Sequence, residues 1–350
     1  MLAAPARAAP FAYIATYCAV GGGFCPAAST VTVVDVATDT TVATVPVGDT
    51  ISASGNFYPF LVAVAPDGMH AYVTCVCGSG PGPPGRHAPL VSVIDAATNA
   101  VTQVYGPLDA VNFSDQGAFG LAVTQDGSRV YVAGQSESSS VPFAPTLFVV
   151  DTATNTVVAS IVDARMRPFR VAITPDGSRA YVTDVGATTI HVIDTNPASA
   201  TYNTILTEIS TNSLGVNAAS VAITPDGSRA YVPAVISSNP FGGNPVLVID
   251  TNPASPTYNT VLTTVIVGAP AAVVLENVAI TPDGSRAYIT QCNPNFACTT
   301  GGGLYVIDTN PASPTYNTQI ATVSIPPISG RLAYGVAITS DGTRAYVTSC

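Results

Sequence analysis

The sequence predicts an all-β fold, a β-propeller built from four-stranded antiparallel blades. Two short apolar runs around a Pro-Asp-Gly turn recur at residues 171–183, 221–233 and 278–290, with looser copies at 62–74, 122–133 and 336–348. Tyrosines in Ala/Val-Tyr-Val/Ile runs return at intervals of 59, 59, 50, 50, 57 and 58 residues. The same order of short β-type runs lies between these tyrosines, and four short strands per repeat are typical of a propeller.

Each repeat supplies four strands, which we name A to D in chain order. Strand A is the Val-Ala-Ile-Thr run before the turn, and strand B is the Ala-Tyr-Val-Thr run after it. Strand D follows a Thr/Asn turn, as at residues 42–45 and 157–161. Strand C is an apolar run ending in Asp, predicted at residues 31–35, 91–95, 147–151, 190–194, 246–250 and 304–308. Strands A and B are apolar on both faces, so a blade must stack on neighbours to bury both.

The number of blades depends on how the ends are counted. The sequence holds seven B strands but six each of A, C and D, and it begins at a B strand and ends just after one. We therefore expect seven blades, the last one incomplete. The alternative is six blades, with residues 336–339 completing the first blade and one B strand left over. Residues 10–350 are expected to form a single propeller domain, and residues 1–9 a signal-peptide remnant or a disordered tail.

Composition narrows the partners and the compartment. The chain is 47% hydrophobic, only 9% charged, and carries a net charge of −10, which argues against nucleic acid or an anionic membrane as partner. No apolar run reaches about 18 residues, so we expect no transmembrane segment. Seven cysteines indicate an oxidising compartment, and we expect a monomer that is secreted or lies in the bacterial cell envelope. The candidate disulfide cysteines are Cys18 with Cys25, Cys292 with Cys298, and Cys75 with Cys77, which leaves Cys350 over.

Several runs resemble a known repeat. They are Phe-Ala-Tyr-Ile-Ala at 11–15, the Val-Ile-Asp-Thr strands, Asp-Thr-Ala-Thr-Asn-Thr-Val at 151–157, and Thr-Pro-Asp-Gly-Ser-Arg-Ala-Tyr-Val-Thr at 174–183. These runs resemble the YVTN-type β-propeller repeats of secreted and surface-layer proteins, and the resemblance covers residues 10–350. It implies the propeller fold. It brings no catalytic residues, because that family is mostly described by its fold.

Strand order places the variable loops on one face. In an antiparallel meander the A–B and C–D turns share one face, and the B–C and D–A loops share the other. The A–B turns are nearly invariant, whereas the B–C and D–A loops differ in length and content, and loops on a rigid scaffold often carry binding sites. The D–A loops also lead into the innermost strands, beside the central channel. The candidate ligand-binding residues are Phe57, Tyr58, Phe113, Arg165, Arg167, Phe169, Arg170, Glu276, Arg331 and Tyr334.

The D–A loop at residues 163–170 is the sharpest local feature. It holds three of the eleven arginines together with an aromatic residue. Arginine side chains suit planar anions, so this loop is a candidate site for a carboxylate or an acidic glycan. The alternative is a solvated loop whose arginines pair with scattered aspartates.

No catalytic or metal-binding constellation is readable. Most aspartates occupy repeated turn or strand-end positions, and five arginines open strand B, which predicts structural roles for both sets. Asp184 and Glu276 depart from the repeat, but the sequence does not pair them with other groups. Three scattered histidines and the absence of Cys-x-x-Cys argue against a metal site or a Ser-His-Asp triad. We expect no metal and no cofactor.

The expected function is that of a binding scaffold. We expect a secreted or cell-envelope propeller that binds a protein or a glycan through its B–C and D–A loop face, without enzymatic activity. Two alternatives stay open. One is a lactonase-like or redox enzyme acting at the channel mouth, which rests on fold analogy. The other is a purely structural surface repeat. The sequence does not name the ligand.

Overall fold

The computed structural model describes residues 11–15, 30–47, 57–77, 91–104, 116–136, 146–163, 165–184, 187–236, 243–268, 274–292, 302–325 and 333–349. These residues form β-strands and one short 3-10 turn, η1 (Asn212–Leu214). No helix in this part of the chain has the length and apolar character to cross a membrane. The chain divides into two compact units, Met1–Pro168 and Phe169–Cys350, and each is considered by itself.

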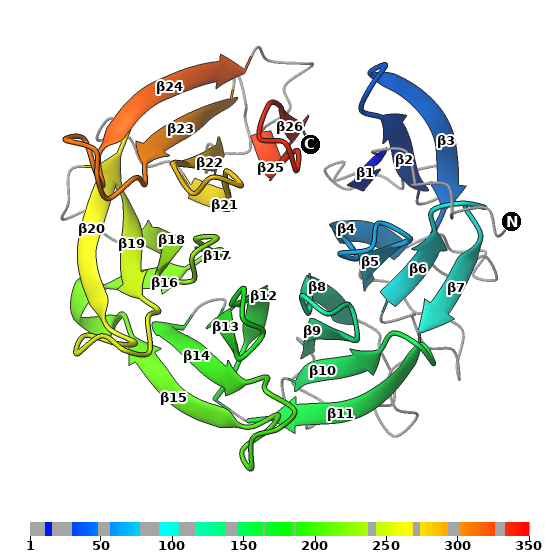
Figure 1. Cartoon of the computed structure of the whole chain (residues 1–350), viewed down its shortest axis with the longest axis horizontal. Coiled ribbons are helices and arrows are strands. Elements are labelled where there is room, and N and C mark those ends of the chain that lie inside the picture. Colours follow the sequence, from blue (N-terminus) through cyan, green and yellow to red (C-terminus); the bar gives the residue numbers. More distant parts are fainter. Residues whose placement is uncertain are drawn as a thin grey trace, which may run out of the picture. The chain divides into compact units, whose positions relative to one another are not determined.

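The first unit contains a three-stranded sheet and two four-stranded meanders (Figure 1). The first sheet consists of β1 (Phe11–Ala15), β2 (Thr30–Asp35) and β3 (Thr40–Pro46). The second consists of β4 (Phe57–Val64), β5 (His70–Cys77), β6 (Val91–Asp95) and β7 (Val101–Val104). The third consists of β8 (Gln116–Val123), β9 (Arg129–Ser136), β10 (Thr146–Asp151) and β11 (Thr156–Val162). A single pairing between Val76 and Gly117 connects the second sheet to the third.

The second unit contains three complete meanders and a two-stranded sheet. The first has β12 (Pro168–Ile173), β13 (Arg179–Asp184), β14 (Thr189–Asp194) and β15 (Ile205–Ser210). The next has strand A split into β16 (Val216–Ala218) and β17 (Ala222–Ile223), then β18 (Arg229–Ile236), β19 (Asn244–Asp250) and β20 (Val261–Val267). The last has β21 (Val274–Ile280), β22 (Arg286–Cys292), β23 (Gly302–Asp308) and β24 (Gln319–Ile325), followed by β25 (Ala333–Ile338) and β26 (Ala345–Ser349). Within this unit the A strands β12, β16, β21 and β25 lie at the inner ends of the sheets (Figure 1).

The predicted β-propeller is confirmed, but the expected number of seven blades is wrong. The structure supports the six-blade alternative. In the described residues, five sheets have all four strands, one sheet has three strands and one has two. Our expectation of seven blades followed the count of B strands in the sequence.

The A–B turn is built as its sequence predicts. In the turn at residues 174–177, the Gly177 amide donates to the Thr174 carbonyl at 2.8 Å, and Gly177 adopts φ +70°. The Thr174 hydroxyl donates to Asp176 at 2.5 Å, and the Ser178 amide donates to the same carboxylate oxygen at 3.0 Å. The repeated aspartate is therefore a structural acceptor that holds the turn closed.

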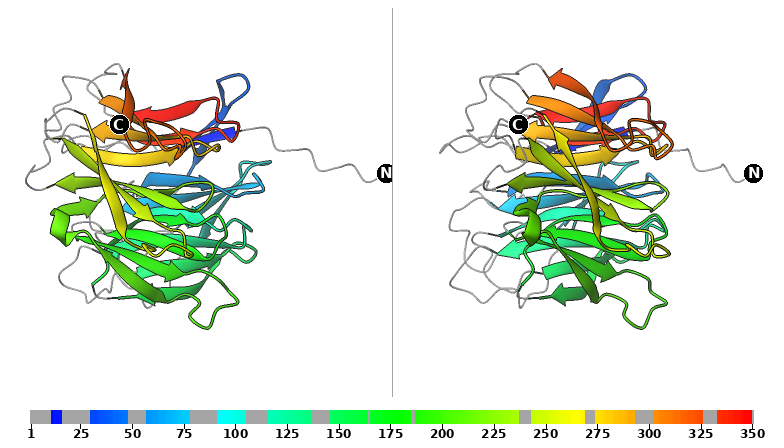
Figure 2. Two further views of the ribbon diagram at one scale, coloured as in Figure 1. Left: turned by 60° about the vertical axis from the view of Figure 1, so that its left-hand side comes forward. Right: turned by 90° about the vertical axis from the view of Figure 1, so that its left-hand side faces the viewer.

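Turns of neighbouring sheets pack against each other in the second unit. A Cβ placed on Gly227 would lie 3.4 Å from Pro175, and one on Gly284 would lie 3.3 Å from Pro225. Figure 2 shows the A–B and C–D turns of this unit on one side of the sheets, as an antiparallel meander requires. Glycine is thus needed in these turns both for its positive φ and for the close approach of the next proline.

The repeated arginines and aspartates tie strand B to strand C at one end. Arg179 lies 3.2 Å from Asp194, and Arg229 lies 3.0 Å from Asp250. The buried Asp250 also accepts from the Asn252 amide and the Thr257 hydroxyl. Both sets of repeated charges therefore have the structural role that the sequence predicted.

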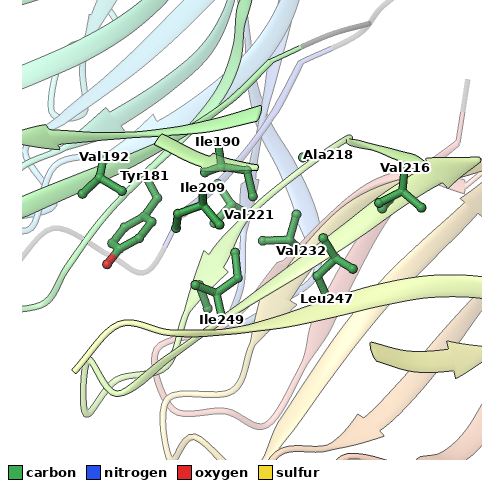
Figure 3. Close-up of a cluster of buried hydrophobic side chains, with 12 residues drawn as sticks. Tyr181, Ile190, Val192, Ile209, Val216, Ala218, Val221, Val232, Leu247 and Ile249 are labelled. Carbon is green, nitrogen blue, oxygen red and sulfur yellow. The ribbon is translucent and has the colours of Figure 1, made fainter. Parts of the chain in front are cut away.

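The hydrophobic cores lie between sheets. One core joins Tyr181, Ile190 and Val192 of the first complete sheet in the second unit to Val216 and Leu247 of the next (Figure 3). These side chains are fully buried, and burial of each large apolar side chain stabilises the fold by roughly 1.5–3 kcal/mol. An equivalent core, centred on Tyr231, lies between the β16–β20 sheet and the β21–β24 sheet.

Two of the recurring strand B tyrosines also form hydrogen bonds to the following sheet. The Tyr181 hydroxyl donates to Asn259 Oδ1, and the Tyr231 hydroxyl donates to Asn317 Oδ1, both at 2.7 Å. Each asparagine lies near the end of a longer, Pro-containing C–D insert, residues 252–260 and 310–318, and adopts positive φ, +58° and +57°. The insert therefore supplies a hydrogen-bonded latch between neighbouring sheets.

Removing one latch is expected to lower stability. Tyr231→Phe deletes the hydroxyl and leaves the Asn317 oxygen short of a donor, at a cost of about 1 kcal/mol in the free energy of unfolding. Tyr288 occupies the same repeat position, but β25 and β26 have no C–D insert after them in the described residues. Tyr288→Phe is the matched control and should cost less than half as much in urea unfolding. Equal losses in the two variants would contradict the latch.

Acid is expected to weaken the turns over a defined range. Hydrogen bonds from the Thr281 side chain, the Ser285 amide and the Ser285 side chain lower the pKa of Asp283 to about 2. An unfolded aspartate has a pKa of about 3.9. Because the folded pKa is the lower one, this contribution is present above about pH 4 and is lost as the pH falls towards 2. Urea unfolding between pH 5 and 2 should show a smaller pH dependence for Asp283→Asn than for the unchanged protein, and identical profiles would exclude this role.

Candidate functional site

The site lies at one repeated step of strand A. The backbone amides of Arg170, Asn277 and Gly335 each donate to a threonine hydroxyl of the adjoining strand B, at 3.2, 3.0 and 2.8 Å. These three residues therefore occupy equivalent positions in β12, β21 and β25. The residues just before them, Phe169, Glu276 and Tyr334, occupy the step at the D–A end of each strand.

A β-bulge directs the side chains at this step. The strand register shifts between Leu275 and Val278 in β21 and between Ala333 and Val336 in β25. Bulges leave residues outside the regular ladder and are common where a side chain must be re-aimed. The Thr290 hydroxyl donates to the Tyr334 carbonyl at 2.8 Å, which ties this step in β25 to the preceding sheet. Hydrogen bonds thus hold the backbone at the bulged position. Its side chain lies outside the regular ladder and can differ between repeats.

Arg170, Glu276 and Tyr334 form an electrostatic cluster from three separate sheets. Arg170 is only 3% exposed, and its guanidinium carbon lies 4.6 Å from the centre of the Phe169 ring. Burial lowers the pKa of Arg170, and the nearby Tyr334 and Glu276 oppose that shift. Burial raises the pKa of Glu276, although Arg170 acts in the opposite direction. The cluster therefore combines a buried cation, an aromatic face, a phenol and a carboxyl group that takes up a proton readily.

A second polar layer lies one residue further along strand A. The Ser220 hydroxyl donates to Asn277 Oδ1 at 3.2 Å, and the same oxygen accepts from the Val278 amide at 2.8 Å. Ser220 and Arg170 are both buried. The inner ends of these sheets are therefore polar, whereas the repeat elsewhere places Val, Ala and Ile in strand A.

The first unit carries aromatic residues at the corresponding step. Leu61 in β4 donates its amide to the Thr74 hydroxyl at 3.2 Å, as Arg170 does to Thr183, and Phe60 precedes it. The Phe60 and Phe119 rings pack edge to face with centroids 5.3 Å apart. The Thr74 hydroxyl donates to the Phe119 carbonyl at 3.0 Å. Neither Phe60 nor Phe119 was a candidate from the sequence, although both align with Phe169 in the repeat.

The arginines of the 163–170 loop have different environments. The Arg165 side chain is 70% exposed and forms a two-pronged pair with Asp163, at 2.8 and 3.1 Å. Arg167 is exposed. Only Arg170 is buried, so the structure does not bring the three arginines together as one anion-binding group.

The remaining sequence candidates lie partly beyond the described residues. Phe57 and Tyr58 belong to β4, and Cys77 and Cys292 to β5 and β22, but their side chains lie outside the described part. Phe113, Arg331, Cys18, Cys25, Cys298 and Cys350 lie outside it altogether. The pairs Cys18–Cys25 and Cys292–Cys298 stay predictions.

Cys75 is a free thiol, so the candidate pair Cys75–Cys77 is not formed. Residues two apart on a strand lie about 6.7 Å apart, near the limit for a disulfide. The Cys75 sulfur instead points across the sheet, 3.9 Å from the Ser92 hydroxyl. Burial raises its pKa to about 12, which makes it a poor nucleophile.

A buried His–Asp pair was not predicted. His191 on β14 places Nε2 2.8 Å from Asp184 on β13 and Nδ1 3.9 Å from Glu208 on β15. His191 and Asp184 are 1% and 0% exposed. The sequence showed that Asp184 departs from the repeat. It did not show that Asp184 on strand B would lie beside His191 on strand C.

The same layer differs from sheet to sheet. In the β4–β7 sheet, the Ser92 hydroxyl lies between Cys75 and Gln103 and donates to Gln103 Oε1 at 2.7 Å. In the β8–β11 sheet, Phe148 packs on Gly134, where an added Cβ would lie 2.7 Å from its ring. The His191–Asp184 pair is therefore one of several side-chain combinations that occupy the same repeated position between strands B and C. Among the residues in view, no group of three or more His, Cys, Asp and Glu could hold a metal ion.

Comparisons with known proteins show the fold and nothing finer. No protein-family model matches the chain, and no curated protein matches it. Among solved structures, hydrazine synthase of Kuenenia stuttgartiensis matches at 22% identity and a TM-score of 0.59, over 83% of this chain and 73% of that one. A functionally unknown protein of Desulfotomaculum acetoxidans matches at 14% identity and a TM-score of 0.63, over 91% and 86%. The likeness to YVTN-type repeats therefore remains a resemblance in sequence.

The two arginines should differ sharply on substitution. Arg170→Met removes a buried guanidinium that stacks on the Phe169 ring and should lower the free energy of unfolding by about 3 kcal/mol, the upper end of the usual range for one substitution. Arg165→Met removes an exposed pair and should change it by less than about 0.5 kcal/mol. Thermal and urea unfolding of both variants test this difference, and comparable effects would mean that Arg170 is not held as described.

Proposed function

We propose that this β-propeller is a binding scaffold that holds a glycan or a protein segment at the D–A ends of its A strands. The observation that carries the proposal is the cluster of Arg170, Glu276 and Tyr334. The three residues come from three sheets, and Glu276 stands at a step that other repeats fill with an aromatic residue. Glu276 and Tyr334 are half-buried.

A purely structural repeat offers no reason for this cluster. The Thr-Pro-Asp-Gly turns of the second unit, by contrast, keep the same residue types from one repeat to the next. Burying a cation costs free energy that an apolar residue at the same step would not. A functional constraint on these positions accounts for both facts.

We further propose that the protein acts outside the cell or in the bacterial cell envelope. Seven cysteines and the resemblance to repeats of secreted and surface-layer proteins support this location. The net charge of −10 keeps the scaffold from non-specific contact with acidic polymers, so that anion recognition depends on local cations.

An enzyme acting at the same place is the second candidate. A carboxyl group with a raised pKa beside a cation and a phenol is the kind of arrangement used for general acid catalysis. The hydrazine synthase match, at 22% identity, adds only the shared fold. An enzyme would alter a bound ligand, whereas a scaffold releases it unchanged.

Binding arrays test the proposal. The purified protein should bind at least one glycan or peptide on defined glycan and peptide arrays, and mass spectrometry should recover that ligand intact. Phe169→Ala should weaken binding about tenfold, equal to about 1.4 kcal/mol, and Arg165→Gln should not. Circular dichroism of both variants checks folding. Binding that ignores Phe169→Ala, or no binding at all, would reject the proposed site, and chemical change in the ligand would favour the enzyme.

A further inference from the structure

His191 lies between two carboxyl groups in the sheet formed by β12 to β15. Its Nε2 atom is 2.8 Å from Asp184 on β13, and its Nδ1 atom is 3.9 Å from Glu208 on β15. His191 and Asp184 are sealed from solvent, whereas the Glu208 side chain is 35% exposed. One buried histidine therefore faces an acid on each neighbouring strand, and one of these acids reaches solvent.

The fold does not require ionisable residues at these three positions. The strand register identifies the equivalent positions in the β16–β20 sheet, which hold Ala234, Leu247 and Thr264. That sheet has the same strands and the same stacking without a charge in this layer. Because buried ionisable groups cost free energy that apolar residues avoid, stability alone does not account for the set of Asp184, His191 and Glu208.

The geometry indicates how many protons His191 and Asp184 hold between them. One proton lies in the hydrogen bond between Nε2 and the Asp184 carboxyl group, on either atom. The Nδ1 atom is buried, makes no hydrogen bond in the described residues, and faces an oxygen of Glu208. A lone pair on Nδ1 would meet a second acceptor there, so the geometry favours a second proton on this atom. With two protons the His191–Asp184 pair is neutral, and with one proton it carries a buried negative charge.

The strands around His191 offer no cation that could offset this charge. Within the second unit, β14 packs against β13, β15 and β16. The one cation on these strands is Arg179, which pairs with Asp194. Arg179 is five residues from Asp184 along β13, which corresponds to roughly 17 Å. Tyr181 belongs to the core on the opposite face of the sheet, and β16 has no titratable residue.

We propose that His191 is a proton-dependent link that holds the outer strand β15 on β14. When Nδ1 carries a proton, it donates to Glu208 as the two side chains close the 3.9 Å gap. When the pH rises, one proton leaves for solvent, two acceptors then face each other beside a buried negative charge, and β15 loosens. No covalent bond forms or breaks. Because β15 leads directly into η1, the loosened segment includes part of this D–A connection, and the link is independent of the binding function proposed above.

The sign of the pH dependence follows from the proton count. A histidine in the unfolded chain loses its proton around pH 6.5. The folded pair keeps two protons beyond that point, because losing one would leave the buried charge without a partner. The folded state then binds more protons than the unfolded state, so the stabilisation is complete at lower pH and is lost as the pH rises.

A variant taken from the neighbouring sheet tests the link. Asp184→Ala, His191→Leu and Glu208→Thr together copy the residues that fill the equivalent layer of the β16–β20 sheet, so the triple variant should fold. Between about pH 6 and about pH 9, the unfolding equilibrium constant of the unchanged protein should rise by up to about tenfold per pH unit more than that of the variant. Identical pH profiles in urea unfolding would overturn the proposal.

A single substitution covers the case in which the triple variant does not fold. Glu208→Gln changes the half-exposed member of the set and removes its negative charge while keeping its size. The second proton is then held less firmly, so this variant should show a smaller pH dependence than the unchanged protein. An unaltered pH dependence would contradict a role for Glu208.

Nuclear magnetic resonance of protein labelled with ¹⁵N at histidine observes the proton itself. The chain has three histidines, and a His191→Gln variant identifies the signals of His191 by their loss. The Nδ1 atom should carry a proton at about pH 6 and lose it towards about pH 9. Absence of that proton at the lower pH would exclude the link, even if His191 were important for folding.

Hydrogen exchange locates the released segment. After correction for the intrinsic effect of pH on exchange, the amides of β15 and η1 should become less protected as the pH rises from about 6 to about 9. The matched strand β20 of the next sheet should keep its protection. Equal loss of protection in β15 and β20 would show a general effect of pH and would reject a link specific to β15.

Discussion

The sheets of this protein are apolar on both faces, and neither face is stable in water. In the second unit, the face that carries Tyr181 packs against the next sheet, and the face that carries Tyr231 packs against the one after it. Each sheet therefore needs a neighbouring sheet on both faces. Because the turns of neighbouring sheets also pack on each other, the turns are nearly identical in sequence. The tyrosine–asparagine latches all run the same way through the stack, because each tyrosine hydroxyl donates to an asparagine of the sheet that follows in the chain.

A scaffold held this firmly can carry an unfavourable group at its inner edge. At the D–A end of strand A, the bulges in β21 and β25 release side chains from the ladder. A buried arginine and a carboxyl of raised pKa are destabilising in isolation, and the surrounding cores offset that cost. The candidate site thus lies at a bulged step of strand A.

Sequence reasoning succeeded where local chemistry decides the structure. The Pro-Asp-Gly turns and the alternation around each tyrosine depend on near neighbours, and the strands and turns were predicted from them. The placement of Phe169, Arg170, Glu276 and Tyr334 at the inner D–A ends followed from strand order. Their convergence did not, because it depends on how separate sheets approach each other. Arg165 was grouped with Arg170 because the sequence does not show which side chain turns inward.

The layer that contains His191, Ser92 and Phe148 has a consequence for assembly. Near-identical repeats are prone to pair with the wrong copy during folding, because their exchanged contacts are almost equivalent. Phe148 fits only where Gly134 leaves room, and His191 finds an acceptor only beside Asp184. Each of these sheets therefore contains neighbouring strands whose side chains fit only each other. Exchanging strands between different repeats would create a steric clash or leave a buried polar group unsatisfied.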